Sequence, residues 1–239
     1  MEAARLTVVY DNEAFDPKME SGWGFSCYVE FAGKKVLFDT GDNPLKLSRN
    51  LACLGLDPRE LDALVFSHEH WDHTGGLGAV LEKNPECPVY IGKNFSAGFK
   101  KKILDQGVRF HEVDEAVPLS QNLHLGPEMH RLGPWEIPMV LELPQGLVVI
   151  TGCAHPGIEG MIKTVKKIFK KEVFLIVGGF HFFASIGIKK KVEAIRRTGV
   201  RKAAPCHCTG ARAIRIFEEL YGSDFIRVGS GLKIDLGRL

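Results

Sequence analysis

In the stretch His68-Glu69-His70-Trp71-Asp72-His73-Thr74, three imidazoles and the carboxylate of Asp72 are four potential metal ligands. It follows the apolar run Leu64-Val65-Phe66 and precedes Gly75-Gly76, a pattern typical of a strand that ends in a tight turn before a helix. Such a turn can aim several donor atoms at one point, and imidazole and carboxylate suit zinc, iron or manganese. A solvated histidine-rich loop is the simpler alternative, but the density of ligands favours a metal site.

The spacing His-x-His-x-Asp-His, formed by His68, His70, Asp72 and His73, resembles the signature of the metallo-β-lactamase superfamily. The resemblance implies that His68 and His70 help to hold one metal, and that Asp72 and His73 help to hold a second. The related flavodiiron oxidoreductases carry glutamate where this chain has His70, which argues against that branch.

Length and composition predict an ordinary globular protein. The chain has 239 residues, 45% hydrophobic and 25% charged, so we expect a single domain over residues 1–239. The N-terminus lacks the features of a secretory signal, and no apolar run approaches the roughly 18 residues of a membrane span. We therefore expect a cytoplasmic protein without a membrane partner. Its six cysteines are scattered without the spacing of a disulfide framework, which in that compartment favours free thiols, and no Cys-x-x-Cys pair is present.

Positive charge is concentrated in residues 163–202, which hold twelve lysines or arginines against Glu172 and Glu193. This basic segment carries a net charge of +10, so the rest of the chain carries −8, given +2 for the whole. Solvated helix faces are the simpler interpretation. A basic rim that attracts a small anionic substrate is the functional one, and no motif indicates a nucleic-acid partner.

The turn at residues 68–74 is called the metal turn below. Before it, strands are expected at residues 6–10, 25–31 and 35–38, and a helix at 44–54 that ends at Gly55. The third strand ends in Asp39-Thr40-Gly41, where a turn-capping aspartate is one interpretation. In the resembled superfamily, a strand with this ending lies beneath the metals. The resemblance therefore implies that Asp39 supports the ligand turn by hydrogen bonding.

After the metal turn, we expect a helix from residue 77, strands at 88–91 and 108–113, and a helix at 95–104. Residues 114–138 contain four prolines and predict loops and short hairpin strands. His111, His124 and His130 share no motif with other ligands, and we expect them to be surface or packing residues.

A repeated design follows, in which an apolar strand ends in a histidine and a helix comes next. The runs 147–150, 173–177 and 200–205 lead into Cys153-Ala154-His155, His181 and Cys206-His207-Cys208, and the last strands are expected at 225–228 and 232–234. Because ligands converge at strand ends on one edge of a layered fold, these histidines are expected to meet the metal turn in one cleft.

Most of the chain resembles the dihydropteroate-synthase-like branch of the superfamily, through Phe38-Asp39-Thr40-Gly41, residues 67–77, residues 151–158, Gly178-Gly179-Phe180-His181 and residues 205–210. The resemblance implies an α/β fold, the αββα four-layer sandwich. It implies that His155 joins His68 and His70 at the first metal and that His207 joins Asp72 and His73 at the second. Cys153 stands where related enzymes place a bridging aspartate, so it could replace or supplement His155.

These features predict a metal-dependent enzyme with one or two divalent metals, zinc first, with iron, manganese or magnesium as alternatives. As a hydrolase it would use metal-activated water on a small anionic substrate such as a phosphate or an ester, with Asp72 orienting the water and His181 donating a proton or contacting the anion. One alternative is a transferase that joins a dihydropterin diphosphate to a ribofuranosylaminobenzene phosphate, the activity named for the branch. Another is a non-catalytic metal-binding or thiol redox-sensing protein, suggested by Cys206 and Cys208.

Overall fold

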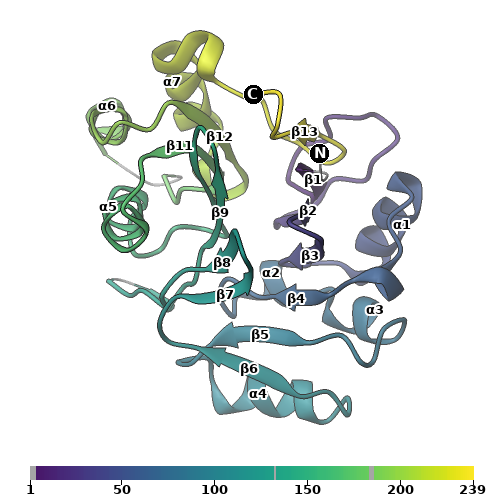
Figure 1. Cartoon of the computed structure of the whole chain (residues 1–239). Coiled ribbons are helices and arrows are strands. Elements are labelled where there is room, and N and C mark those ends of the chain that lie inside the picture. Colours follow the sequence, from purple (N-terminus) through teal and green to yellow (C-terminus); the bar gives the residue numbers. More distant parts are fainter. Residues whose placement is uncertain (1–3, 132, 183–185) are drawn as a thin grey trace.

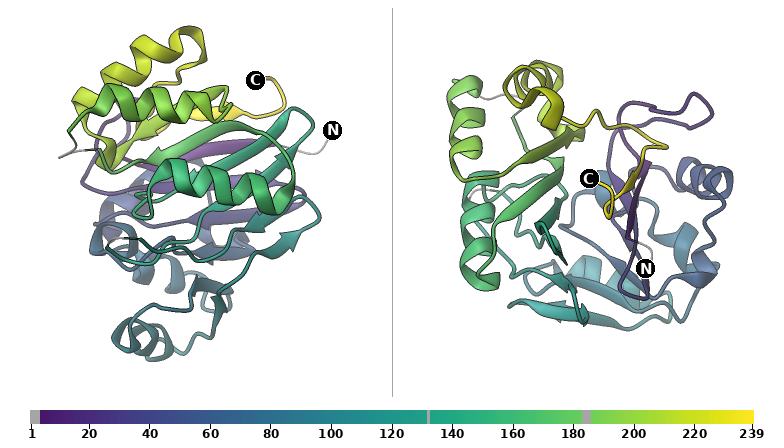
Figure 2. Two further views of the ribbon diagram at one scale, coloured as in Figure 1. Left: turned by 90° about the vertical axis from the view of Figure 1, so that its left-hand side faces the viewer. Right: turned by 45° about the horizontal axis from the view of Figure 1, so that its top comes forward.

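The computed structural model describes residues 4–131, 133–182 and 186–239. Two β-sheets face each other in the middle of the molecule, and helices cover the outer face of each sheet (Figure 1). Figure 2 shows the same layers from two further directions, with the helices of the second half of the chain on one side. This arrangement confirms the predicted αββα sandwich.

The first sheet has, within the described residues, seven strands in the order β13-β1-β2-β3-β4-β5-β6. Its strands are β1 (Arg5–Tyr10), β2 (Ser26–Phe31), β3 (Lys34–Phe38), β4 (Ala63–Val65), β5 (Val89–Gly92), β6 (Phe110–Val113) and β13 (Lys233–Asp235). Strands β3 to β6 run parallel, whereas β13, β1, β2 and β3 pair antiparallel.

The second sheet has six described strands in the order β12-β11-β10-β9-β8-β7. They are β7 (Val117–Ser120), β8 (Leu123–Leu125), β9 (Met139–Leu143), β10 (Gly146–Thr151), β11 (Val173–Gly179) and β12 (Lys202–Cys206). Strands β10, β11 and β12 run parallel, so their carboxyl ends lie at one edge.

The helices follow the capping and periodicity signals of the sequence. Helix α1 (Pro44–Leu54) begins at Asn43, whose side chain accepts hydrogen bonds from two backbone N–H groups, and ends at the left-handed Gly55. The others are α2 (Trp71–Thr74), α3 (Leu77–Leu81), α4 (Ala97–Leu104), α5 (Ile158–Phe169), α6 (Ile188–Arg197) and α7 (Ala211–Tyr221), with 3₁₀ turns at Pro58–Glu60, His207–Thr209 and Gly222–Asp224.

Three apolar layers hold the sandwich together. The layer between the sheets contains Phe38 and Val148, while Leu47 packs between the first sheet and its helices and Met161 between the second sheet and its helices. Each of these side chains is fully buried. Burial of this kind contributes about 1.5–3 kcal/mol for each large apolar side chain. In the described part of the chain, no helix is both long and apolar enough to cross a bilayer.

One local expectation was wrong. Residues 225–228 do not form a strand: Phe225 makes one isolated bridge to Ala203, and the chain then crosses to β1, where Leu232 bonds to Val8. After β12 the chain forms a 3₁₀ turn at His207–Thr209, so the alternation of side chains along a strand does not continue through this turn.

Gly178 permits the close pairing of β11 with β10. Its φ is +122°, and a Cβ atom there would lie 2.0 Å from the carbonyl oxygen of Thr151. We predict that Gly178→Ala lowers the free energy of unfolding, by about 1–3 kcal/mol from backbone strain alone. Denaturant titration measures this loss.

Gly160→Ala is the matched control, because this exposed helical glycine has open space around its Cβ position. It should raise the free energy of unfolding by roughly 0.5–1 kcal/mol, since alanine favours the helix. Equal stability of Gly178→Ala and the wild type would contradict the close-packing argument.

Candidate metal centre

Three histidines form the first group of candidate ligands. His68 and His70 follow β4, His155 follows β10, and their donor nitrogens all lie within 4.8 Å of one another. Four buried side-chain polar atoms in the described residues have no hydrogen-bond partner, and two of them are Nε2 of His68 and Nε2 of His155. A buried nitrogen without a partner is costly unless something absent from a bare protein binds it.

Asp72, His73 and His207 form the second group, again with donor atoms within 4.8 Å of one another. Nε2 of His207 lies 3.2 Å from Nε2 of His73 and 3.3 Å from a carboxylate oxygen of Asp72. Cys153 adjoins this group, with its Sγ 3.3 Å from Nε2 of His73.

Asp39, at the end of β3, holds the metal turn from below. Its carboxylate accepts hydrogen bonds from the backbone N–H and the hydroxyl of Ser67, both at 2.7 Å, and lies 2.7 Å from Nδ1 of His73. Because the Ser67 hydroxyl donates to Asp39, it is free to accept from Nδ1 of His68 at 2.9 Å. Both imidazoles therefore carry their proton on Nδ1 and direct the Nε2 lone pair into the site.

Asn12, just after β1, orients His207 in the same way. Its side-chain oxygen accepts a hydrogen bond from the N–H of Gly24 and lies 3.0 Å from Nδ1 of His207. Because this oxygen acts as an acceptor, Nδ1 of His207 is the donor. The neighbouring Asp11 accepts the backbone N–H of His207 at 3.0 Å, so the segment just after β1 positions both the ring and the backbone of His207.

Electrostatics favours neutral imidazoles that point at a cation. Burial lowers the pKa of His68 well below its usual value, and it lowers the pKa values of His73 and His155 to about 3. At His207 burial also lowers the pKa, but the hydrogen bond and charge of Asp72, together with the charges of Cys208 and Asp11, raise the pKa overall. A metal at this position would compete with that proton. The residues present therefore fit a divalent metal bound by nitrogen and oxygen ligands.

A model of the metallo-beta-lactamase superfamily matches residues 24–197, which include the metal turn and the loop that carries His155. The chain belongs to the metallo-beta-lactamase superfamily. Proteins of this superfamily generally bind one or two divalent metals, in agreement with the two ligand groups.

Relatives within the superfamily have different named activities. The chain is 28% identical to 7,8-dihydropterin-6-methyl-4-(beta-D-ribofuranosyl)-aminobenzene-5′-phosphate synthase of Methanocaldococcus jannaschii, over 89% of this chain and 88% of the relative. It resembles the crystal structure of Tm1679, described as a metal-dependent hydrolase of the beta-lactamase superfamily, with a TM-score of 0.83 and 29% identity over 98% of this chain and 99% of the other. The Bacillus subtilis protein YhfI shares the fold, with a TM-score of 0.69 and 15% identity over 96% and 98% of the two chains.

Glu136 builds the loop that carries His155. It is fully buried, and its two carboxylate oxygens accept the backbone N–H groups of four successive residues, Gly152 to His155, at 2.9–3.0 Å. Burial raises the pKa of Glu136 to about 7, although these hydrogen bonds act against the shift. The carboxylate folds the loop into a curve that brings Cys153 toward the second ligand group and His155 toward the first.

Backbone strain is concentrated at this edge of the fold. Six non-glycine residues of the described chain have positive φ, and four of them follow the strands that form the site: Asp39, Ala154, His181 and His207. Such conformations cost about 1–3 kcal/mol each and persist where the surrounding structure enforces them.

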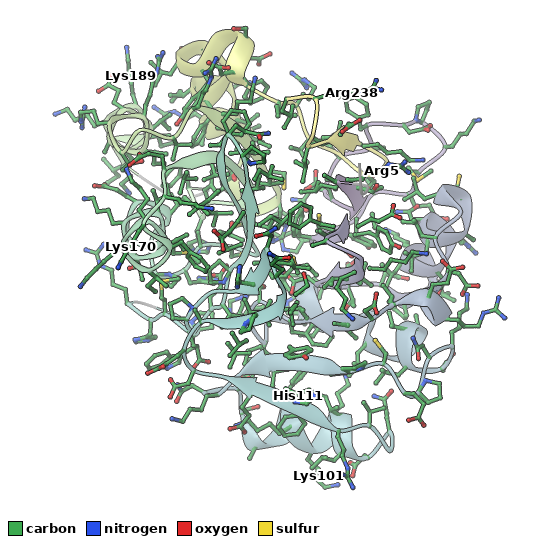
Figure 3. The ribbon with its side chains drawn as sticks, viewed as in Figure 1. Arg5, Lys101, His111, Lys170, Lys189 and Arg238 are labelled. Carbon is green, nitrogen blue, oxygen red and sulfur yellow. The ribbon has the colours of Figure 1, made fainter. Side chains whose placement is uncertain are left out.

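Of the other histidines, His181 lies at the edge of the site, whereas the remaining three make contacts elsewhere. The ring of His181 lies 4.5 Å from that of His155, and its side chain is exposed at the edge of the site. His124 pairs with Glu142, while His111 stacks on Tyr90 and His130 on Trp135. Figure 3 labels His111 on β6, an edge strand of the first sheet. None of these three belongs to a ligand group of the described residues.

Sequence reasoning missed three supporting residues, Asn12, Ser67 and Glu136. Asn12 and Ser67 follow apolar strands, so their position was a usable signal. Glu136 lies between Trp135 and Ile137 in a proline-rich loop, and no spacing relates it to the N–H groups that it binds.

We predict that Asp39→Asn weakens metal binding about 10–100-fold, the range typical of lost support for ligating histidines. Oδ2 of Asp39 accepts from both His73 and the Ser67 hydroxyl, and the amide nitrogen that would replace it in asparagine can accept from neither. Competition with a chelator measures the metal affinity. Asp62→Asn, at the opposite end of the same strand pair, removes an exposed carboxylate and should leave the affinity unchanged. Equal affinities for the two variants would refute the supporting role of Asp39.

We predict that Glu136→Gln selectively removes the metal held through His155. A glutamine amide would place N–H groups against backbone N–H groups, and each unsatisfied donor costs about 1–3 kcal/mol. Metal analysis should show a lower metal-to-protein ratio than in the wild type. Glu142→Gln, which alters only a surface pairing with His124 and Lys171, is the control. An unchanged ratio in Glu136→Gln would show that the loop holds its shape without the carboxylate.

Proposed function

We propose that this protein is a metal-dependent hydrolase that acts on a small anionic substrate, a phosphate ester or a related ester. The observation that carries the proposal is the pair of ligand groups, His68-His70-His155 and Asp72-His73-His207, with the unpartnered buried nitrogens of His68 and His155. We assign these six residues as the metal ligands. His70 is exposed, so a substrate can reach the first group from solvent.

Divalent metal bound here would supply Lewis-acid polarisation of the substrate and acidify water from a pKa of about 16 to about 7. Side chains of the protein would then orient the water and donate the proton. Partial burial raises the pKa of Asp72, but the hydrogen bond and charge of His207 and the charge of His73 bring it to about 2, so it stays ionised and can orient water. His181 is our proton donor, because the hydrogen bond with Cys208 raises its pKa and its ring lies beside that of His155.

We propose His155 rather than Cys153 as the third ligand of the first group. Burial raises the pKa of the Cys153 thiol well above its usual value, which disfavours the thiolate that binds metal. The nitrogen of His155 is already in its neutral, ligating form. The nitrogen and oxygen ligands make zinc our first choice of metal, and the six free cysteines support our proposal of a cytoplasmic protein.

A synthase that transfers a pterin group is the second candidate, supported by the similarity to the Methanocaldococcus jannaschii enzyme over most of both chains. Two pockets at the site also favour a two-substrate reaction. One, of about 590 Å³, adjoins His70 and His155, and the other, of about 690 Å³, adjoins His207 and Trp23. The ring of Trp23 lies 5.3 Å from that of His207, close enough to pack against a flat ring brought to the second ligand group.

One assay separates the two reactions. Zinc-loaded protein is given a dihydropterin diphosphate with and without a ribofuranosylaminobenzene phosphate, and aryl phosphate and carboxylic esters are tested separately. We predict ester hydrolysis that falls at least 100-fold in His207→Ala and is retained in His130→Ala, whose ring stacks on Trp135 outside the ligand groups. Diphosphate release only when both substrates are present would support the synthase. Turnover of none of these compounds would refute both.

A further inference from the structure

Two cysteines that are 55 residues apart in the sequence meet beside the candidate ligands. Cys153 follows β10, and Cys208 lies in the 3₁₀ turn after β12. Their Sγ atoms and a ring nitrogen of His207 all lie within 4.8 Å of one another, and Sγ of Cys208 lies 3.7 Å from the carbonyl oxygen of Cys153. Both are buried free thiols. A disulfide bond is about 2.05 Å long, so the sulfur atoms must approach further by rotation of the two side chains.

Gly179, at the end of β11, leaves room for this thiol pair. A Cβ atom on Gly179 would lie 2.6 Å from Sγ of Cys208 and 3.3 Å from Cα of Cys153. Both cysteines therefore adjoin the position where a larger residue would carry its side chain. Strands β10, β11 and β12 are parallel neighbours, so their pairing fixes the spacing between the two segments that carry the thiols.

Cys206, two residues before Cys208, is directed elsewhere. Its side chain belongs to the apolar layer between the sheets. It takes part in none of the candidate ligand groups of the described residues, whereas Cys153 and Cys208 share one. The structure therefore brings Cys208 to the cysteine of another loop rather than to its near neighbour in the sequence.

The thiol pair lies behind an open pocket. This pocket, of about 590 Å³, is lined by His155 and His181, and ring nitrogens of both histidines lie within 4.8 Å of Sγ of Cys153. Cys153 itself is only 3% exposed, which excludes bulky reagents. A small uncharged oxidant such as hydrogen peroxide can approach the thiol through the pocket.

We propose that Cys153 and Cys208 form a disulfide when the protein meets hydrogen peroxide, and that this bond weakens metal binding at the second ligand group. The two sulfur atoms are oxidised and the peroxide is reduced. Two S–H bonds and the O–O bond break, one S–S bond and two O–H bonds form, and two water molecules leave. The disulfide joins the loop that carries His155 to the turn that carries His207.

Metal binding is affected because both cysteines adjoin candidate ligands. Sγ of Cys153 lies 3.3 Å from Nε2 of His73, and Cys208 directly follows His207, whose φ is +47°. A turn held in this left-handed conformation has little freedom to adapt to a new covalent bond while keeping the His207 ring in place. This effect rests on the proposed function, because it uses the proposed ligand set, whereas formation of the disulfide does not.

The test treats zinc-loaded protein with hydrogen peroxide, counts the thiols after unfolding, and maps the products by mass spectrometry without reduction. We expect the thiol count to fall by two from six, with a crosslink between Cys153 and Cys208 that dithiothreitol reverses. Cys53→Ser, which removes an exposed thiol, should form the same disulfide, whereas Cys208→Ser should form none. Retention of all the thiols, a crosslink between Cys206 and Cys208, or irreversible oxidation of the two thiols would refute the disulfide.

Competition with a chelator then compares the zinc affinity of the oxidised and the re-reduced protein. We expect the oxidised wild type to bind zinc about tenfold more weakly, as when a ligating histidine loses its support. Cys208→Ser treated in the same way should keep its affinity. Equal affinities of the oxidised and the re-reduced wild type would refute the effect on metal binding. A loss of affinity in Cys208→Ser would assign the effect to another oxidised group and refute it as well.

Disulfide formation and ester hydrolysis are measured separately. If the disulfide forms and the zinc affinity falls but the wild type hydrolyses no ester, the oxidation site stands and the hydrolase proposal fails. If esters are hydrolysed but no disulfide forms, the oxidation site alone is refuted.

Discussion

The site depends on one electrostatic constraint: several lone pairs are directed at the same buried space. Nε2 of His73 and Nε2 of His207 lie 3.2 Å apart, with a carboxylate oxygen of Asp72 beside them. Negative and lone-pair atoms at such distances repel one another unless a cation, either a proton or a metal, lies between them. The supporting hydrogen bonds of Asp39 and Asn12 make sense under this constraint, because they occupy the opposite ring nitrogens and leave the imidazoles no other orientation.

Meeting this constraint requires backbone that regular elements cannot provide. The candidate ligands follow β4, β10 and β12, which belong to two different sheets, so each turn must curve toward a point between the layers. Left-handed conformations at Ala154 and His207 and the four N–H groups bound by Glu136 are how the chain achieves those curves. The apolar layers supply the stability that offsets this strain. The site therefore depends on the rigid sandwich for its stability. In the sequence, however, the motif of the site is easier to identify than the pattern of the sandwich.

Sequence reasoning predicted the parts of this molecule that depend on local pattern. The helix at 44–54, the strand ends and the ligand turn follow from periodicity, capping and spacing, and the resemblance to a family supplied the layering. It could not find Glu136, because a carboxylate that binds backbone N–H groups sixteen or more residues away leaves no pattern in the sequence. It also misjudged residues 225–228, since pairing there is decided by competition between β12 and β1, a tertiary effect.

Substrate choice must come from outside the ligand set. Relatives with this fold include a synthase and a hydrolase, so the shared metal chemistry does not select between reactions. Selection must therefore depend on side chains beside the candidate ligand groups. His181 and Phe182 line the pocket at the first group, whereas the aromatic ring of Trp23 lines the pocket at the second. Because the two pockets have unlike linings, a substrate with two unlike ends would be favoured in one orientation over the other.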